Sequence, residues 1–118
     1  MAVWARAWAS RDVDAVAALY ADGAVFFSHP FRDDMAPRTY VEWAFGEQAS
    51  AEFRFGEPIV EGDRAAVDWW AAITAPDDSV ESIAGTSMLR FGADGLVVEQ
   101  RDVWAAVSER RDLPDWAR

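Results

Sequence analysis

Cysteine and lysine are absent from this sequence of 118 residues, and histidine occurs only once, as His29. The eleven basic residues are therefore all arginines. These absences exclude thiol nucleophiles, disulfide bonds, Schiff-base lysines and metal sites that contain several histidines. Catalysis by this chain has to rely on carboxylates, hydroxyls and one imidazole, which suits proton transfer without a metal or cofactor.

Basic residues are also few relative to acidic ones. Eleven arginines stand against 21 acidic residues, which gives a net charge of −10 and an isoelectric point near 4.3. Nucleic-acid binding needs a basic surface, so we expect no nucleic-acid partner. Charges interrupt every apolar run, so we expect no membrane partner either. The sequence shows no apolar leader with a cleavage site, and we therefore expect a cytoplasmic protein.

Tryptophan, by contrast, is abundant. The chain has seven tryptophans, and a single domain covering residues 1–118 is too small to place all of them in its central core. An indole combines a large apolar area with an N–H group that needs a hydrogen-bond partner when buried. We therefore expect some tryptophans to line a subunit interface or a pocket for a lipophilic small molecule.

The first half of the chain has helical periodicity. Three helices are expected, over residues 3–9, 13–20 and 37–48. Trp4 and Trp8 share one face of the first helix because they are four residues apart. Asp12 is a suitable N-cap for the second helix, and Pro37 suits the first turn of the third. A short apolar strand over residues 24–29 separates the second helix from the third.

From residue 51 onward, apolar and polar residues alternate, which is typical of strands. Four strands are expected, over residues 52–60, 64–74, 80–91 and 96–107. The turns between them are short and rich in glycine and aspartate, so consecutive strands should form an antiparallel meander. Helices followed by a meander predict an α+β domain in which the helices pack on one face of the sheet.

Two segments resemble a known family. They are Asp12–Ala24 (DVDAVAALYADGA) and Leu89–Trp104 (LRFGADGLVVEQRDVW). With the expected element order, they resemble the nuclear transport factor 2-like superfamily, and within it the SnoaL-like proteins, relatives of polyketide cyclases and ketosteroid isomerases. The resemblance covers residues 3–106. It implies a cone-shaped, curved antiparallel sheet wrapped over the N-terminal helices, an apolar pocket inside the cone, and a homodimer formed through the outer sheet face.

The resemblance also implies positions for site residues. The oxyanion-hole tyrosine of ketosteroid isomerases falls at Trp4, their proton-shuttling aspartate at or beside His29, and their second oxyanion donor at Ser87. All three residue types differ, so ketosteroid isomerase activity itself is not expected. What remains is a base before Pro30 that faces hydrogen-bond donors across a cavity. In SnoaL-type cyclases an aspartate of the last strand is the acid/base residue, and Asp102 is the nearest candidate.

Strand alternation predicts which side chains face the cavity. If Ser87 and Trp104 point inward, so do Ile83, Leu89, Val98, Gln100 and Asp102. The same alignment places Asp68 and Trp70 inside, where an aspartate beside an indole in an apolar pocket has a raised pKa. It leaves an apolar outer row of Val67, Trp69, Ala71 and Ile73. We expect this row to be the dimer interface, because it is too apolar for solvent.

Two classes of function are compatible with these residues. The first is a cofactor-free isomerase, cyclase or dehydratase acting on a lipophilic, carbonyl-bearing or polycyclic molecule. Its general base would be His29 and its acid Asp102 or Asp68. Its hydrogen-bond donors and substrate-binding residues would be Trp4, Trp8, Trp70, Ser87, Gln100 and Trp104. The alternative is a non-catalytic binding module of the same fold, or a dimer whose cavity is filled by its own aromatic side chains.

Each catalytic candidate also has a structural interpretation. A lone histidine at a strand end is commonly a packed, hydrogen-bonded residue. Asp68 and Asp102 could instead pair with Arg54, Arg90 or an indole N–H. The position of His29 discriminates between these hypotheses. Catalysis in the form above requires His29 on the cavity wall, within hydrogen-bond reach of an acid, directly or through one water.

Overall fold

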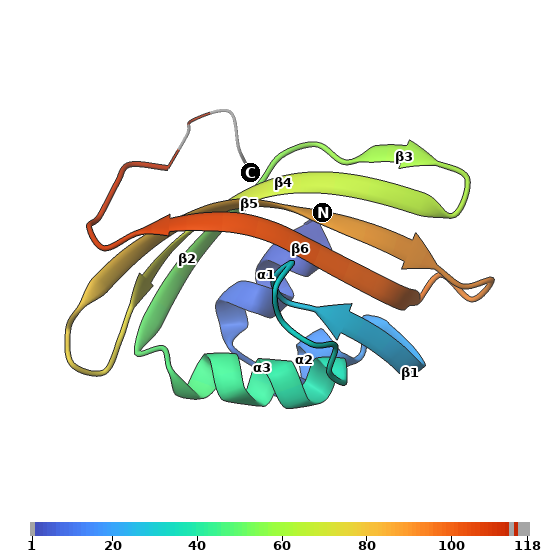
Figure 1. Cartoon of the computed structure of the whole chain (residues 1–118), viewed down its shortest axis with the longest axis horizontal. Coiled ribbons are helices and arrows are strands. Elements are labelled where there is room, and N and C mark those ends of the chain that lie inside the picture. The colour runs from blue at the N-terminus through green and yellow to red at the C-terminus, as the bar shows by residue number, and fades with distance from the viewer. Residues whose placement is uncertain (1, 114, 116–118) are drawn as a thin grey trace.

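In the described part of the chain, six strands form a curved sheet that arches over three helices (Figure 1). The computed structural model describes residues 2–113 and 115, with side chains from residue 6 onward. The helices are α1 (Ala2–Ser10), α2 (Val13–Ala17) and α3 (Pro37–Gly46). The strands are β1 (Tyr20–Phe27), β2 (Ser50–Phe55), β3 (Ile59–Glu61), β4 (Arg64–Thr74), β5 (Val80–Phe91) and β6 (Val97–Val107).

The strand order is β1-β6-β5-β4-β2, and β3 also pairs with β4. The helices lie on the concave side of the sheet, so the expected α+β class and the curved sheet over N-terminal helices are confirmed (Figure 1). The sheet is mixed rather than antiparallel, because β1 runs parallel to β6. The expected strand 52–60 is divided into β2 and β3 around Pro58, which has no N–H group for a ladder.

The start of α2 is as expected, but its end is not. Asp12 Oδ1 accepts the backbone N–H groups of Asp14 and Ala15 at 3.0 and 3.3 Å, which confirms it as the N-cap. The helix then ends at Ala17, and Tyr20 already pairs with Val97 of β6. Pairing with the sheet therefore prevails over the helical pattern predicted for residues 18–20.

Arg11 connects the turn after α1 to the end of α3. Its guanidinium donates to the carbonyl of Phe45 at 3.2 Å, and also to the carbonyls of Gln48 and Ala49. A cation stabilises the C-terminal end of a helix, where backbone carbonyls lack intrahelical partners. This contact fixes the backbone of Gln48 against the N-terminal segment.

The core lies between the helices and the sheet, around side chains with no exposed surface: Val16, Phe26, Val41 and Val97. A register shift between Arg90 and Phe91 makes Phe91 the partner of Val97. Consequently Val97 enters the core, and the prediction that Val98 faces the cavity is wrong. Within the described residues, no helix is both long and apolar enough to cross a bilayer.

Candidate active site

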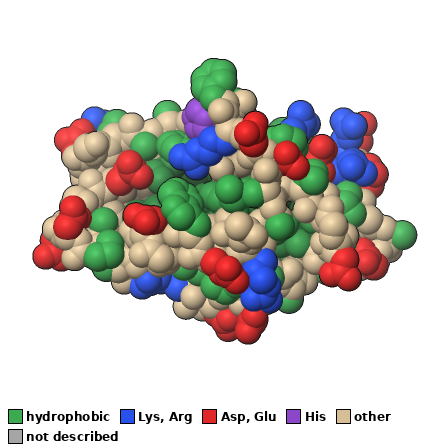
Figure 2. All heavy atoms as spheres, turned by 60° about the horizontal axis from the view of Figure 1, so that its bottom comes forward, with side chains coloured by type: hydrophobic (Ala, Val, Ile, Leu, Met, Phe, Trp, Pro, Cys, Tyr) green, Lys and Arg blue, Asp and Glu red, His purple; other side chains and the backbone are tan. Residues whose placement is uncertain are grey.

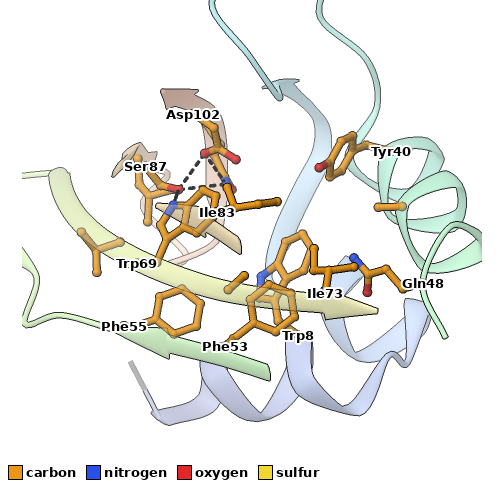
Figure 3. A pocket seen from close by; sticks show the side chains of 15 residues that line it. Trp8, Tyr40, Gln48, Phe53, Phe55, Trp69, Ile73, Ile83, Ser87 and Asp102 are labelled. Carbon is orange, nitrogen blue, oxygen red and sulfur yellow. Dashed lines mark hydrogen bonds between the residues drawn. The ribbon is translucent and has the colours of Figure 1, made fainter. Parts of the chain in front are cut away.

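A pocket lies on the concave side of the sheet, between the sheet and helices α1 and α3, and we call it the inner pocket (Figure 3). Its walls are mainly apolar, and its polar side chains other than tryptophan are Tyr40, Gln48, Ser87, Gln100 and Asp102. Its volume is about 80 Å³. An apolar cavity of about 150 Å³ holds benzene, so the inner pocket accommodates only one end of a larger molecule.

The side chains of strand β4 point to the opposite faces of the sheet from those that the sequence predicts. Trp69 and Ile73 line the inner pocket, together with Val67 and Ala71. Because side chains alternate along a strand, Asp68 and Trp70 lie on the outer face of the sheet. Their assignment to the cavity is therefore wrong by one residue in register. The predicted dimer interface of Val67, Trp69, Ala71 and Ile73 is wrong for the same reason, since these residues line the pocket.

Asp102 is held in the inner pocket by a hydrogen-bond network (Figure 3). Ser87 of β5 lies directly opposite Asp102 of β6, and its hydroxyl donates to Asp102 Oδ1 at 2.6 Å. The Gln100 amide donates to the same oxygen at 2.9 Å. The Trp69 indole N–H donates to Ser87 Oγ at 2.9 Å, and the Tyr20 hydroxyl donates to Gln100 Oε1. The network thus fixes both donors that orient Asp102.

The two carboxylate oxygens of Asp102 have different surroundings. Oδ1 accepts both hydrogen bonds, whereas no described residue donates to Oδ2, which lies on the side of Tyr40 (Figure 3). Burial raises the pKa of Asp102 to about 6, although the hydrogen bonds from Ser87 and Gln100 lower it. A carboxyl group with this pKa gains and loses a proton close to neutral pH, which is what an acid/base residue requires.

Tyr40 of α3 lies across the inner pocket from Asp102, and its hydroxyl points toward the aspartate (Figure 3). Its ring stacks on Phe26 with 4.6 Å between ring centroids, which fixes its direction. Burial and the charge of Asp102 raise the pKa of Tyr40 to about 12, while Arg32 lowers it. The phenol therefore stays protonated at neutral pH and can donate a hydrogen bond. Helical periodicity alone places Tyr40 inward but cannot show which residue it faces.

A wider cavity of about 510 Å³, the vestibule, adjoins the inner pocket. Five residues line both cavities and form the neck between them: Tyr40, Ala44, Gln48, Ile73 and Ile83. At the vestibule wall, the Arg32 guanidinium lies 5.8 Å from the ring centroid of Trp43 and 5.4 Å from that of Trp104. On this face of the molecule, Figure 2 shows a hollow with hydrophobic side chains beside His29. The tryptophan side chains that the structure describes therefore leave the vestibule open.

His29 lies at the rim and lines neither the inner pocket nor the vestibule. Its ring packs edge-on against Trp104 with 4.9 Å between centroids, and its Nδ1 accepts the Phe31 N–H at 3.2 Å. The Trp104 indole N–H in turn donates to the Ser28 carbonyl at 2.5 Å. His29 is thus packed and hydrogen-bonded in the turn after β1. Trp104 lies on the same sheet face as Asp102, as alternation predicts, but it lines the vestibule rather than the inner pocket.

The remaining candidates are divided. Trp8 lines the inner pocket and packs edge-on against Phe45 with 5.8 Å between centroids. Ser87 and Gln100 both lie in the pocket, where alternation places them. The side chain of Trp4 lies outside the described residues. No group of His, Asp and Glu side chains suited to a metal ion occurs among the residues that the structure describes.

Gly85 makes room for the network. A Cβ atom at this position would lie 2.9 Å from Trp69 Cζ2 and 2.7 Å from the Val103 carbonyl oxygen. Gly85 pairs with Trp69 on one side and with Trp104 on the other. Its lack of a side chain lets the Trp69 indole lie over β5 and reach Ser87. A glycine within a strand is the sequence signal for such a close approach.

Residues 2–100 match the SnoaL-like domain family, and the chain belongs to that family. No curated protein matches the chain. Among solved structures, the chain is similar to SalBIII, described as an epoxide hydrolase/cyclase-like enzyme in pyran ring formation in the polyether salinomycin. The two share 19% identity over 88% of this chain and 86% of that chain, at a TM-score of 0.78. It is also similar to a hypothetical protein with a ketosteroid isomerase-like fold from Catenulispora acidiphila, with 13% identity over 86% of this chain and 81% of that chain, at a TM-score of 0.76. A third similar structure, described as a putative SnoaL-like polyketide cyclase from Shewanella denitrificans, shares 14% identity over 88% of this chain and 86% of that chain, at a TM-score of 0.73.

Proposed function

We propose that this protein is a cofactor-free proton-transfer enzyme, an isomerase or cyclase, that acts on a lipophilic small molecule bearing a carbonyl group. Asp102 is its acid/base residue, and Tyr40 donates a hydrogen bond to the substrate oxygen. The observation that carries the proposal is the Asp102 carboxyl group, which is held through one oxygen and presents the other to an apolar pocket opposite a phenol.

The reaction needs no group beyond the chain and the substrate. Ionised Asp102 removes a proton from the carbon next to the substrate carbonyl, and Tyr40 stabilises the negative charge that develops on the carbonyl oxygen. Protonated Asp102 then returns the proton to another atom of the substrate, which completes an isomerisation or accompanies ring closure. The apolar walls favour this chemistry because a hydrogen bond to a developing charge is stronger in a poorly solvated site.

Three observations support this choice. The pKa of Asp102, about 6, leaves the carboxylate mainly ionised at neutral pH while keeping it basic enough to accept a proton. The structural neighbours include a protein described as epoxide hydrolase/cyclase-like in pyran ring formation. Another neighbour is described as a putative polyketide cyclase. The base proposed here is Asp102 and not His29, because His29 lines neither cavity.

Hydrogen–deuterium exchange of a simple ketone tests the proposal without knowledge of the natural substrate. 4-Phenylbutan-2-one is incubated with the protein in D₂O, and deuterium at the carbons next to the carbonyl is measured by mass spectrometry. We expect the wild-type protein to accelerate exchange over buffer. Asp102→Asn should lower the accelerated rate by roughly two to four orders of magnitude. Tyr40→Phe should lower it by about two orders of magnitude.

Asp68→Asn is the matched control, because it removes a carboxylate from the same sheet but from the outer face. The Asp68→Asn variant should accelerate hydrogen–deuterium exchange of the ketone as much as the wild-type protein does. If the wild-type protein binds the ketone, as read by quenching of tryptophan fluorescence, but never exceeds the buffer rate, the enzymatic proposal fails. The protein would then be a binding module of the same fold.

We also propose that a second copy of the chain covers the outer sheet face. The outer face carries Trp70 of β4. Trp70 pairs with Ala84 of β5, which in turn pairs with Ala105 of β6, so these three residues form an apolar row across the sheet. Val103 and Met88 on the same face are 56% and 41% exposed. Apolar side chains clustered on an antiparallel sheet are typical of an isologous interface.

A further inference from the structure

Arg32 is held in place at the wall of the vestibule. The chain turns after β1, where the backbone N–H of Arg32 donates to the His29 carbonyl at 3.0 Å. This turn brings Arg32 back to the buried residue Ser28, whose Oγ accepts a hydrogen bond from Arg32 Nη1 at 3.2 Å. The guanidinium also packs on Trp104 of β6 and Trp43 of α3, at 5.4 and 5.8 Å from the ring centroids. Contacts with three elements of the fold therefore fix the position of this cation.

The Arg32 guanidinium has no carboxylate partner among the residues that the structure describes. Glu47 and Glu81 also line the vestibule, but neither forms an ion pair with Arg32. Five other arginines do pair with acidic side chains, and they are Arg38, Arg54, Arg90, Arg110 and Arg111. A guanidinium has five N–H donors, and Ser28 accepts from one nitrogen of Arg32. Because Arg32 is exposed, its other N–H groups are accessible to a ligand in the vestibule.

Arg32 lies close to the route into the inner pocket. It lines the vestibule together with Tyr40, and its charge lowers the pKa of Tyr40, so the two groups are near enough to interact. Figure 2 shows an arginine side chain beside His29, at the edge of the hollow. The inner pocket has a volume of only about 80 Å³, compared with about 510 Å³ for the vestibule. A molecule with its carbonyl group at Tyr40 therefore extends into the space that Arg32 lines.

We propose that Arg32 binds a carboxylate group of the substrate, which makes the substrate class a lipophilic keto acid. This inference rests on the proposed function for the carbonyl end of the molecule. A guanidinium that packs on aromatic rings keeps N–H groups at its edge, where a carboxylate accepts two parallel hydrogen bonds. Glu47 and Glu81 repel a second negative charge in the vestibule, which favours a carboxylate over a doubly charged phosphate.

Two probes of similar shape but different charge test the inference by binding alone, without turnover. They are 4-(3-oxobutyl)benzoate and its methyl ester, and their affinities are measured by calorimetry. We expect the wild-type protein to bind the benzoate about tenfold more tightly at low salt, with a smaller preference as sodium chloride is added. Arg32→Gln should bind both probes with equal affinity, because it lacks the cation. Arg32→Met, which keeps an unbranched apolar chain against the indoles, serves as a second variant with the same expectation.

Arg90→Gln is the matched control. It removes the same charge from an exposed arginine of β5 that lines neither cavity, so it should keep the tenfold preference. Equal affinities in the wild type would overturn the inference, as would a preference that persists in Arg32→Gln or disappears in Arg90→Gln. Tighter binding of 4-(3-oxobutyl)phenyl phosphate than of the benzoate would overturn the choice of a carboxylate.

Asp102→Asn separates this inference from the proposed function. The variant should lose deuterium exchange of 4-phenylbutan-2-one but keep the preference for the benzoate over its ester. A wild-type protein that prefers the benzoate but never accelerates exchange would refute the proposed function and support the role of Arg32. A wild-type protein that accelerates exchange but binds both probes equally would do the reverse.

Discussion

Replacing Asp102 by asparagine should stabilise the protein at neutral and higher pH. Oδ1 accepts hydrogen bonds from Ser87 and Gln100, and an asparagine oxygen can accept both. The asparagine NH₂ group then takes the place of Oδ2, which has no donor among the described residues. The substitution therefore removes a buried charge without breaking the network.

The magnitude follows from the pKa of Asp102. Burial raises the pKa from its usual 3.8 to about 6, so the folded state binds this proton more tightly than the unfolded state does. The resulting stability is fully present below pH of about 4 and is lost as the pH rises through about 6. A difference of about two pKa units at 1.36 kcal/mol each corresponds to about 3 kcal/mol. At pH of about 8, Asp102→Asn should thus be about 3 kcal/mol more stable than the wild type.

Urea unfolding at a series of pH values between about 4 and 8 measures this difference. We expect the two proteins to differ little at the acidic end and to diverge through pH of about 6. In thermal unfolding at high pH, the gain corresponds to on the order of 10 °C for a domain of this size. Asp68→Asn controls for the loss of one negative charge from the sheet. A variant no more stable than the wild type at high pH, or a pH-independent difference, would refute the reasoning.

Three further outcomes are expected. Ser87→Ala removes a hydrogen bond that lowers the pKa of Asp102, so the midpoint of the pH-dependent stability should move above 6 in the same urea series; an unchanged or lower midpoint would contradict the network. His29→Ala should keep the exchange rate of 4-phenylbutan-2-one within about twofold, whereas a loss of about a hundredfold would return His29 to the chemistry. Trp70→Glu should halve the molar mass measured by light scattering, and a wild-type protein that is already monomeric at micromolar concentration would exclude the interface.

Much of the fold is predictable because local signals agree with it. Asp12 is placed to cap α2, and Gly62 and Gly95 occupy turns with φ of +59° and +80°, which glycine adopts easily. The register of β4 is different, because apolar residues occupy both of its faces around Trp69 and Trp70. A one-residue shift leaves such a pattern equally apolar on either side. Only the contact of Trp69 with Ser87 across Gly85 decides between the two faces.

The site is predictable in part for similar reasons. Alternation along β5 and β6 brings Ser87, Gln100 and Asp102 to one face, as the structure shows. The role of Tyr40 depends on how α3 lies across the sheet, and nothing local in the sequence determines that geometry. The residue type of His29 predicts a role in proton transfer, but its packed environment at the rim arises from Trp104, which is distant in the chain.

Titration of the Asp102 carboxyl carbon by ¹³C NMR tests most directly whether this residue is the acid/base group of the pocket. Asp102→Asn identifies the resonance by its disappearance from the spectrum. In the wild-type protein we expect a midpoint at pH of about 6, because burial raises the pKa of this carboxyl group. A midpoint near the ordinary value of about 4 would contradict the central claim, since the carboxylate would then be a weak base at neutral pH.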